Sequence, residues 1–125
     1  MKKFYICKVC GNLVEVIEEG GGVLTCCNQP MIGLEANTVE ASFEKHIPVV
    51  EINDGIVNVK VGSVDHPMIE EHYISWIYLK YDGGNQMVKL LAGMKPEASF
   101  CINDAKNIEV YAYCNLHGLW KADIK

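Results

Sequence analysis

Cysteine and histidine side chains of this chain fall into two groups that could each hold a metal ion. The first group begins with Cys7 and Cys10, a Cys-x-x-Cys pair, and ends with the adjacent Cys26 and Cys27. Four thiolates can close a tetrahedral shell around zinc or iron, and their spacing alone does not separate the two metals. The alternative for these residues is a pair of disulfides or idle thiols.

The adjacent Cys26 and Cys27 set a geometric condition on this group. Successive side chains of an extended segment point to opposite sides, so the two sulfurs diverge unless the backbone turns. We therefore expect a turn at this position and a strained tetrahedron.

The second group contains every histidine of the chain and one further cysteine: His46, His66, His72, Cys114 and His117. A lone histidine is more often a surface or hydrogen-bonded residue than a ligand. Cys114 and His117 favour metal binding, because a thiolate and an imidazole three residues apart can chelate one ion in the turn that ends at Gly118. Pro67 stiffens the loop that would aim His66.

The elements that must position these residues differ between the two ends of the chain. Residues 1–36 are rich in Cys and Gly and contain little that could form a core, so this part needs a metal to fold. From residue 37, β-forming runs alternate with turns; the runs span 47–52, 56–61, 73–81, 86–91, 98–102 and 108–113. Hairpin turns are expected at 53–55 and 82–85. We therefore predict a mainly β protein, with a small metal-binding module at 1–36 and an antiparallel β-sandwich at 37–125.

Charge and composition exclude several classes of protein. The 125 residues carry a net charge of −5, which repels a phosphate backbone and argues against a nucleic-acid partner. No apolar run suits a signal sequence before Cys7, and nowhere do the roughly 20 apolar residues of a membrane helix run together. We expect a cytoplasmic protein with reduced thiols and no membrane partner.

Short motifs in both parts resemble one known family. Cys-Lys-Val-Cys-Gly-Asn followed by Cys-Cys-Asn-Gln-Pro-Met is similar to the desulforedoxin module, whose cysteines bind one rubredoxin-like iron. Glu-Lys-His-x-Pro, His-Pro-Met-x-x-x-His-Tyr-Ile and Cys-Asn-x-His-Gly-x-Trp occur together, in this order, in the iron domain of superoxide reductases. The chain thus resembles the desulfoferrodoxin family of two-iron superoxide reductases over nearly its whole length.

The resemblance implies a fold and an activity. The family fold adds an immunoglobulin-like sandwich to the desulforedoxin-like module, and the proteins are usually homodimers. The implied activity is the one-electron reduction of superoxide to hydrogen peroxide, without dismutation to oxygen, which detoxifies superoxide in an anaerobe-type cytoplasm. Rubredoxin or a similar small protein would donate the electrons.

The resemblance also implies a role for each site residue. Iron site 1 would be held by Cys7, Cys10, Cys26 and Cys27, and iron site 2 by the equatorial imidazoles of His46, His66, His72 and His117 with the thiolate of Cys114 on the axis. Lys45 would draw in superoxide as a catalytic residue. Glu44, also catalytic, would be a possible sixth ligand of the oxidised iron.

Such a ligand set suits the chemistry. A thiolate opposite an open coordination position pushes electron density toward the substrate. Ferrous iron with one thiolate carries about one positive charge, which attracts an anion that the whole protein repels. Two other functions fit the same motifs, namely an electron-transfer protein whose irons only relay charge and a zinc-stabilised interaction module. An open site beside Lys45 favours the enzyme.

The remaining candidates are expected to be structural. Cys101 has no ligand position left to fill and is predicted to be a buried strand residue, because free cysteine packs as a small hydrophobe. The aromatic residues at alternating or strand-end positions are predicted to belong to the core; they are Tyr73, Trp76, Tyr111, Tyr113 and Trp120.

Overall fold

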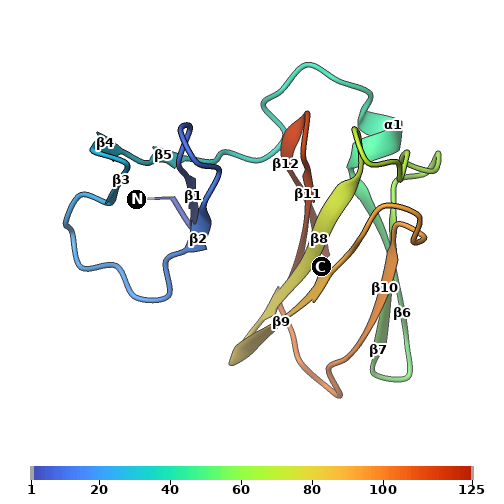
Figure 1. The fold of residues 1–125 in the computed structure, drawn as a ribbon. Helices are drawn as coiled ribbons and strands as arrows, with labels where there is room; N and C mark the ends of the chain where they lie inside the picture. The colour runs from blue at the N-terminus through green and yellow to red at the C-terminus, as the bar shows by residue number, and fades with distance from the viewer. Residues whose placement is uncertain (1, 125) are drawn as a thin grey trace. The chain divides into compact units, whose positions relative to one another are not determined.

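The computed structural model describes residues 2–124, and the chain divides into two compact units, Met1–Glu35 and Ala36–Lys125. Both units consist of strands and connections, with one helical turn in the second (Figure 1). The predicted mainly β fold, with a four-cysteine module and a sandwich, is confirmed. Among the described residues, none of the helical structure has the length and apolar character needed to cross a membrane.

The smaller unit consists of short strands with hardly any core. Strand β1 (Phe4–Ile6) pairs with β2 (Leu13–Glu15) and β5 (Ile32–Gly33), and β3 (Thr25–Cys26) pairs with β4 (Gln29–Pro30). Ile17 and Val23, which a larger fold would bury, are 87% and 78% exposed. So little apolar burial does not offset the loss of chain entropy, and a metal cross-link has to stabilise this unit.

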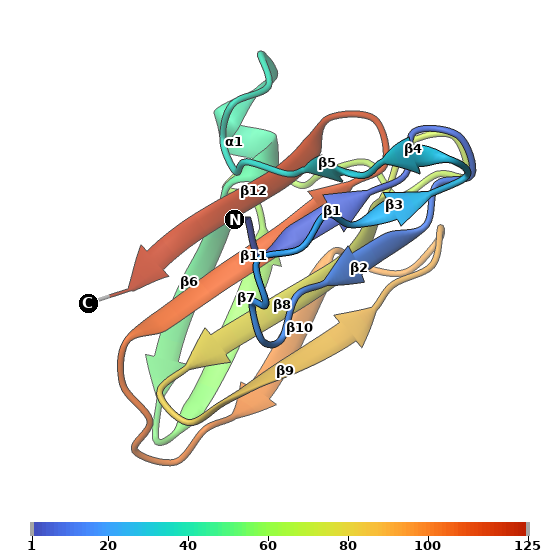
Figure 2. The same ribbon diagram turned by 90° about the vertical axis from the view of Figure 1, so that its left-hand side faces the viewer.

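The larger unit is a sandwich of two antiparallel sheets (Figures 1 and 2). The first sheet has the order β10-β7-β6, with β6 at Pro48–Asn53, β7 at Ile56–Val61 and β10 at Glu97–Cys101. The second has the order β12-β11-β8-β9, with β8 at Ile74–Tyr81, β9 at Gly84–Lys89, β11 at Ile108–Cys114 and β12 at Gly118–Ile124. A single turn of helix, α1 (Phe43–His46), comes directly before β6.

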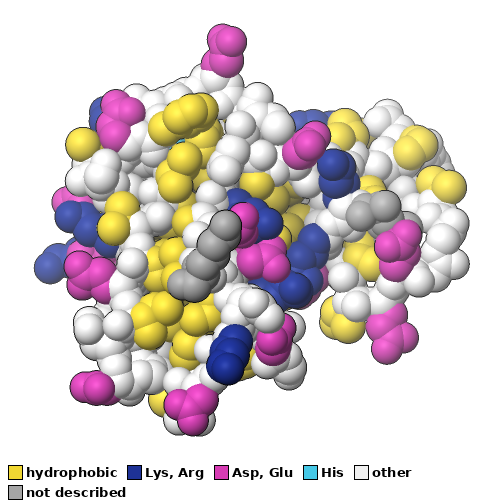
Figure 3. Space-filling view, turned by 180° about the vertical axis from the view of Figure 1, so that it is seen from behind, with side chains coloured by type: hydrophobic (Ala, Val, Ile, Leu, Met, Phe, Trp, Pro, Cys, Tyr) yellow, Lys and Arg dark blue, Asp and Glu magenta, His cyan; other side chains and the backbone are white. Residues whose placement is uncertain are grey.

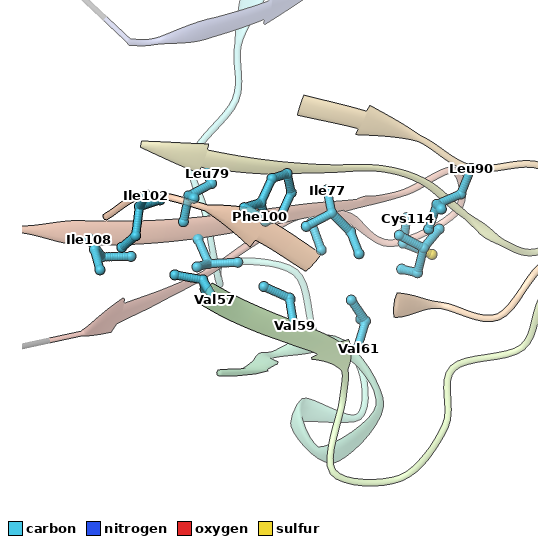
Figure 4. Packing of buried hydrophobic residues seen from close by; sticks show 13 residues of the cluster. Val57, Val59, Val61, Ile77, Leu79, Leu90, Phe100, Ile102, Ile108 and Cys114 are labelled. Carbon is cyan, nitrogen blue, oxygen red and sulfur yellow. The ribbon is translucent and has the colours of Figure 1, made fainter. Parts of the chain in front are cut away.

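The core lies between the two sheets and sets the strand register. In β7, buried Val57, Val59 and Val61 alternate with exposed Asn58 and Lys60, as expected for a half-buried strand. The three valines belong to one cluster with residues of the facing sheet, among them Ile77, Leu79, Val110, Ala112 and Cys114 (Figure 4). A slip of one residue would turn the apolar set to solvent, so this packing fixes the register of the strands.

The hairpin at Asp54 and Gly55 is confirmed, because both residues have the positive φ of a two-residue turn, 51° and 77°. The next hairpin is tighter than expected. Tyr81 pairs with Gly84, so β9 begins at Gly84 and only two residues form the loop. Strand β12 was not predicted, since charged Lys121 and Asp123 interrupt its β-forming residues.

The prediction that Cys101 is buried is wrong. Its neighbour Phe100 occupies the inward position of β10 and is 3% exposed, so the alternation of the strand turns Cys101 outward. The Cys101 sulfur lies 4.0 Å from Oδ1 of Asn103. Like the other five cysteines it is a free thiol, which excludes the disulfide alternative in this structure.

Candidate metal centres

Candidate ligands of the second group meet at one end of the sandwich, although they come from three segments. His46 ends α1, His66 and His72 lie between β7 and β8, and Cys114 and His117 lie where β11 turns into β12. In four of these residues, His46, His72, Cys114 and His117, one ligand atom each lies within 4.8 Å of the other three. The fold therefore brings together residues up to 71 positions apart in the chain.

His66 joins this cluster through its neighbours. Its Nε2 lies 3.1 Å from Nε2 of His46, and its ring packs edge-on against His72 with centroids 4.6 Å apart. The other two neighbouring pairs, His46 with His117 and His72 with His117, are also edge-on at 4.9 Å. His46 and His72 face each other across the group at 6.3 Å. The four imidazoles thus form a closed square.

The tautomers of His46 and His66 leave their two unprotonated Nε2 atoms facing each other. Nδ1 of His46 lies 2.7 Å from the Ser42 carbonyl, and Nδ1 of His66 lies 2.7 Å from the Pro67 carbonyl. Because a carbonyl only accepts hydrogen bonds, both Nδ1 atoms carry the proton and both Nε2 atoms of the neutral rings present a lone pair. Two lone pairs 3.1 Å apart repel each other unless a cation lies between them.

Protonation does not supply that cation near neutral pH. Burial lowers the pKa of His66 to about 4 and also lowers the pKa of His46, so both rings are neutral there. Nε2 of His72 is buried and, among the described residues, has no hydrogen-bond partner. A nitrogen in this situation is costly unless it binds a metal. The donor set therefore fits a metal ion.

Distances within the square agree with a transition metal. Donors at right angles around an ion, with metal–nitrogen bonds of about 2.1 Å, lie about 3 Å apart. Nε2 of His46 is 3.1 Å from both Nδ1 of His117 and Nε2 of His66. Four imidazoles and one sulfur exceed the four ligands of a structural zinc site and are donors that iron accepts.

Cys114 supplies the sulfur of this cluster. It is 0% exposed, and its Sγ lies 3.8 Å from Nδ1 of His117. Burial raises the pKa of the Cys114 thiol, and backbone N–H groups of His117 and Leu116 offset this only in part. Deprotonation of Cys114 is therefore coupled to metal binding.

Two residues that were not predicted as site residues hold the ligands in place. Trp120, expected only in the core, is fully buried; it stacks on the His46 ring at 4.8 Å and donates a hydrogen bond from Nε1 to the His117 carbonyl. Asn115 accepts a hydrogen bond from the Tyr73 N–H and donates one to the Glu71 carbonyl, which ties the Cys114 turn to the His72 loop. Both residues lie inside the Cys-Asn-x-His-Gly-x-Trp motif, so the signal was present.

Lys45 and Glu44 lie on α1, immediately before His46. Lys45 is half-buried and Glu44 is exposed. The pKa of His72 is lowered mainly by burial, then by His117 and by the positive charge of Lys45. The charge of Lys45 is therefore felt at the imidazole square.

The four cysteines of the first group also converge, with all sulfurs within 4.8 Å of one another. Sγ of Cys26 lies 3.6 Å from that of Cys10 and 4.0 Å from that of Cys27. Four thiolates with metal–sulfur bonds of about 2.3 Å have their sulfurs about 3.8 Å apart in a tetrahedron. This cluster therefore fits a single metal ion.

A two-residue turn solves the geometric problem of the adjacent cysteines. Cys27 and Asn28 connect β3 to β4, and both have a positive φ, 53° and 60°. This is the left-handed conformation of the tight hairpin turn, which non-glycine residues adopt at some cost. The expected turn is confirmed, and the strained tetrahedron stays a prediction.

The Cys7 end of the module is arranged to hold a thiolate. The Gly11 N–H donates to the Cys7 carbonyl at 2.9 Å, and the Asn12 N–H donates to the Cys10 sulfur at 3.5 Å. The backbone N–H of Cys10 is the main cause that lowers the pKa of Cys7 to about 6, whereas burial acts in the opposite direction. Backbone N–H groups at this end of the module therefore favour a thiolate.

A mainly β chain with a four-thiol cluster and a cluster of four imidazoles and one thiol has the features of a non-haem protein with two iron sites. The family model described as desulfoferrodoxin matches residues 38–123, and that described as desulfoferrodoxin, N-terminal domain, matches residues 1–34. The chain belongs to the desulfoferrodoxin family.

Individual relatives cover nearly the whole chain. A desulfoferrodoxin of Desulfarculus baarsii is 52% identical over 119 residues, which are 95% of this chain and 94% of that protein. A desulfoferrodoxin of Nitratidesulfovibrio vulgaris is 47% identical over 121 residues, 97% of this chain and 95% of that protein. The crystal structure of the superoxide reductase from Treponema pallidum is 39% identical, has a TM-score of 0.79 and covers 96% of this chain and 97% of its own. The two clusters are consistent with the two iron sites of desulfoferrodoxins.

Replacing Cys10 with Ser tests whether the two clusters are independent. The two clusters share no residue and lie in separate units, so the variant should lose the first metal while the second site keeps its spectrum. Amide hydrogen exchange in residues 2–35 should accelerate by about tenfold or more, because this unit depends on its metal.

Cys101→Ser is the matched control, since Cys101 is an exposed thiol outside both clusters. Loss of the second spectrum in Cys10→Ser, with the control unchanged, would show that the units depend on each other.

Proposed function

We propose that this chain is a superoxide reductase, which delivers one electron to superoxide and releases hydrogen peroxide after the uptake of two protons. The observation that carries the proposal is the convergence of four imidazoles and one thiol beside the positive charge of Lys45. An iron ion held by these donors supplies the electron. Relatives named superoxide reductase, such as that of Treponema pallidum, support the assignment.

We propose specific roles for the residues around the metal. His46, His66, His72, His117 and Cys114 hold the iron of site 2, and Cys7, Cys10, Cys26 and Cys27 hold the iron of site 1. Residues 1–36 then form the desulforedoxin-like module, and residues 37–125 form the catalytic domain. The expectation of a role for each ligand came from the family motifs, and the geometry of the clusters supports it.

The chain's own groups contribute mainly electrostatics and positioning. Lys45 places a positive charge on a protein with a net charge of −5, so it attracts the anionic substrate at short range. Glu44 lies on the same turn and is exposed, and its carboxylate would be a sixth ligand of the oxidised iron. Ser42 and Pro67 keep Nδ1 of two ligands protonated, so that Nε2 remains free to bind.

Two further proposals concern the electron donor of the enzyme and the cellular location of the protein. Rubredoxin or a similar small protein is proposed as the donor; Cys10 and Cys27 are exposed, so a one-electron donor can approach site 1 closely. A cytoplasmic location is proposed because none of the six cysteines forms a disulfide, as is typical of a reducing compartment. An electron-transfer role without catalysis is less favoured, because a carrier gains nothing from a lysine beside its iron.

We also propose that the protein is a homodimer. Strands β6 and β12 contact each other at the open side of the sandwich, and each is the edge strand of its sheet. Hydrophobic side chains gather in a band on this side of the larger unit (Figure 3), and Phe43 and Ile52 are 56% and 41% exposed. Exposed apolar side chains beside unpaired strand edges favour association with a second copy.

Cys114→Ser should abolish superoxide reduction while the iron of site 1 stays bound. A hydroxyl is a far weaker donor to iron than a thiolate, and the two clusters share no ligand. Stopped-flow kinetics with superoxide measures the loss of activity. The optical spectrum of site 1 measures whether its iron stays bound. Activity near the wild-type level would refute the assignment of Cys114 as the sulfur ligand.

Lys45→Ala should slow the second-order reaction with superoxide by roughly tenfold or more and weaken its dependence on ionic strength, because the local attraction is removed. Glu44→Ala is the matched control on the same turn. It should react with superoxide almost as fast as the wild type and change only the spectrum of the oxidised iron. Pulse radiolysis at several salt concentrations measures both variants, and an unchanged rate and salt slope in Lys45→Ala would remove its catalytic role.

Sedimentation equilibrium at micromolar concentration should give the mass of two chains. Ile52→Glu should shift the mass toward one chain, because a carboxylate at an apolar interface is costly to bury. Val23→Glu is the control, since Val23 is an exposed apolar residue of the smaller unit. A one-chain mass for the wild type would refute the dimer.

A further inference from the structure

The turn that carries Glu44 and Lys45 rests against a glycine. A Cβ placed on Gly62 would lie 2.5 Å from the Glu44 carbonyl oxygen and 2.9 Å from the carbonyl carbon of Lys45. Both contacts are with backbone atoms, which cannot rotate away as the end of a side chain can. Any side chain at this position must therefore displace the backbone of Glu44 and Lys45.

Residues next to Gly62 hold the same backbone by hydrogen bonds. The Val64 N–H donates to the Glu44 carbonyl oxygen at 2.8 Å, and the Ser63 hydroxyl donates to the same oxygen at 3.2 Å. Two residues further on, the His66 N–H donates to the Val61 carbonyl at 3.1 Å. Residues 61–66, here called the bracket, thus connect the α1 turn to the loop that carries His66.

The His46 ring is supported by groups outside the bracket, whereas the Lys45 backbone N–H donates to the Ser42 carbonyl at 3.3 Å. The His46 ring is held by the Ser42 carbonyl and by stacking on Trp120. The Lys45 side chain leaves the backbone at the peptide that the bracket holds. A displacement of this peptide therefore moves the charge of Lys45 relative to the imidazole square more than it moves the His46 ring.

We propose that Gly62 and Ser63 are positioning residues for the substrate-facing turn: Gly62 admits the Glu44 carbonyl at close range, and Ser63 fixes it by a hydrogen bond. The proposal rests on the proposed superoxide reductase activity. It assigns the bracket a role in aiming Lys45 and Glu44, beyond its part in the fold.

Gly62→Ala tests the close approach, with Gly22→Ala as the matched control because nothing lies within 4 Å of a Cβ at Gly22. The rate constant with superoxide should fall on the order of 10- to 100-fold, the size of effect that a misplacement of about 1 Å produces. Its dependence on ionic strength should weaken, since the misplaced group is Lys45. Hydrogen exchange of a peptide that contains Val64, followed by mass spectrometry on the iron-loaded protein, should accelerate by about tenfold.

Ser63→Ala tests the hydrogen bond without adding an atom and remains informative if Gly62→Ala does not fold. The rate constant should fall roughly two- to fivefold and Ser63→Thr, which keeps the hydroxyl, should restore it. Ser99→Ala is the matched control, because the Ser99 hydroxyl bonds to Asn58 on the exposed face of the sandwich.

Several outcomes overturn the inference. The inference is overturned if Gly62→Ala folds and keeps the wild-type rate constant with superoxide, the wild-type dependence on ionic strength and the wild-type hydrogen exchange of the Val64 peptide. A loss of melting temperature alone, with the rate and salt slope unchanged, would show that the bracket serves only the fold. Equal rates for Ser63→Ala and the wild type would remove Ser63 from the proposal. If the wild-type protein itself fails to reduce superoxide, the proposed function fails first, and the exchange of the Val64 peptide still decides the positional claim.

Discussion

The second unit depends on one constraint: unprotonated imidazole nitrogens of neighbouring histidines face one another. His46 and His66 both donate their Nδ1 protons to carbonyl groups, so their Nε2 lone pairs meet at 3.1 Å. Burial keeps the rings neutral by lowering the pKa of each, and His72 adds a buried nitrogen that has no partner among the described residues. Only a cation turns this arrangement from repulsive to stabilising. Metal binding is therefore coupled to the packing of the four imidazoles at this end of the sandwich.

The rest of the sandwich supplies the rigidity that such an arrangement needs. Val61, at the end of β7, and Ile74, at the start of β8, are fully buried, and the ligands follow or precede these anchored positions. Trp120 connects the core to the imidazole cluster, because it is fully buried and also stacks on the His46 ring. The smaller unit lacks such a core and relies on its four sulfurs, with one left-handed turn at Cys27 to aim them.

Much of this could be predicted from the sequence, and the exceptions have physical reasons. Alternation in runs such as 56–61 identified the strands, and the motifs identified the candidate ligands. Strand β12 was missed because its pairing with β11, not its own composition, makes it a strand. The exposure of Cys101 depends on which face of β10 points inward, and Phe100 decides this. The role of Gly62 depends on a contact with a backbone carbonyl 18 residues away, which no local pattern records.

Iron K-edge X-ray absorption of the reduced wild-type protein tests the central claim most directly, since it counts the atoms bound to the metal. With two irons per chain by metal analysis, the account predicts five sulfur and four nitrogen ligands in total over the two irons. A shell of sulfur alone, or a single iron per chain, would contradict the convergence of the four histidines and Cys114 on one metal.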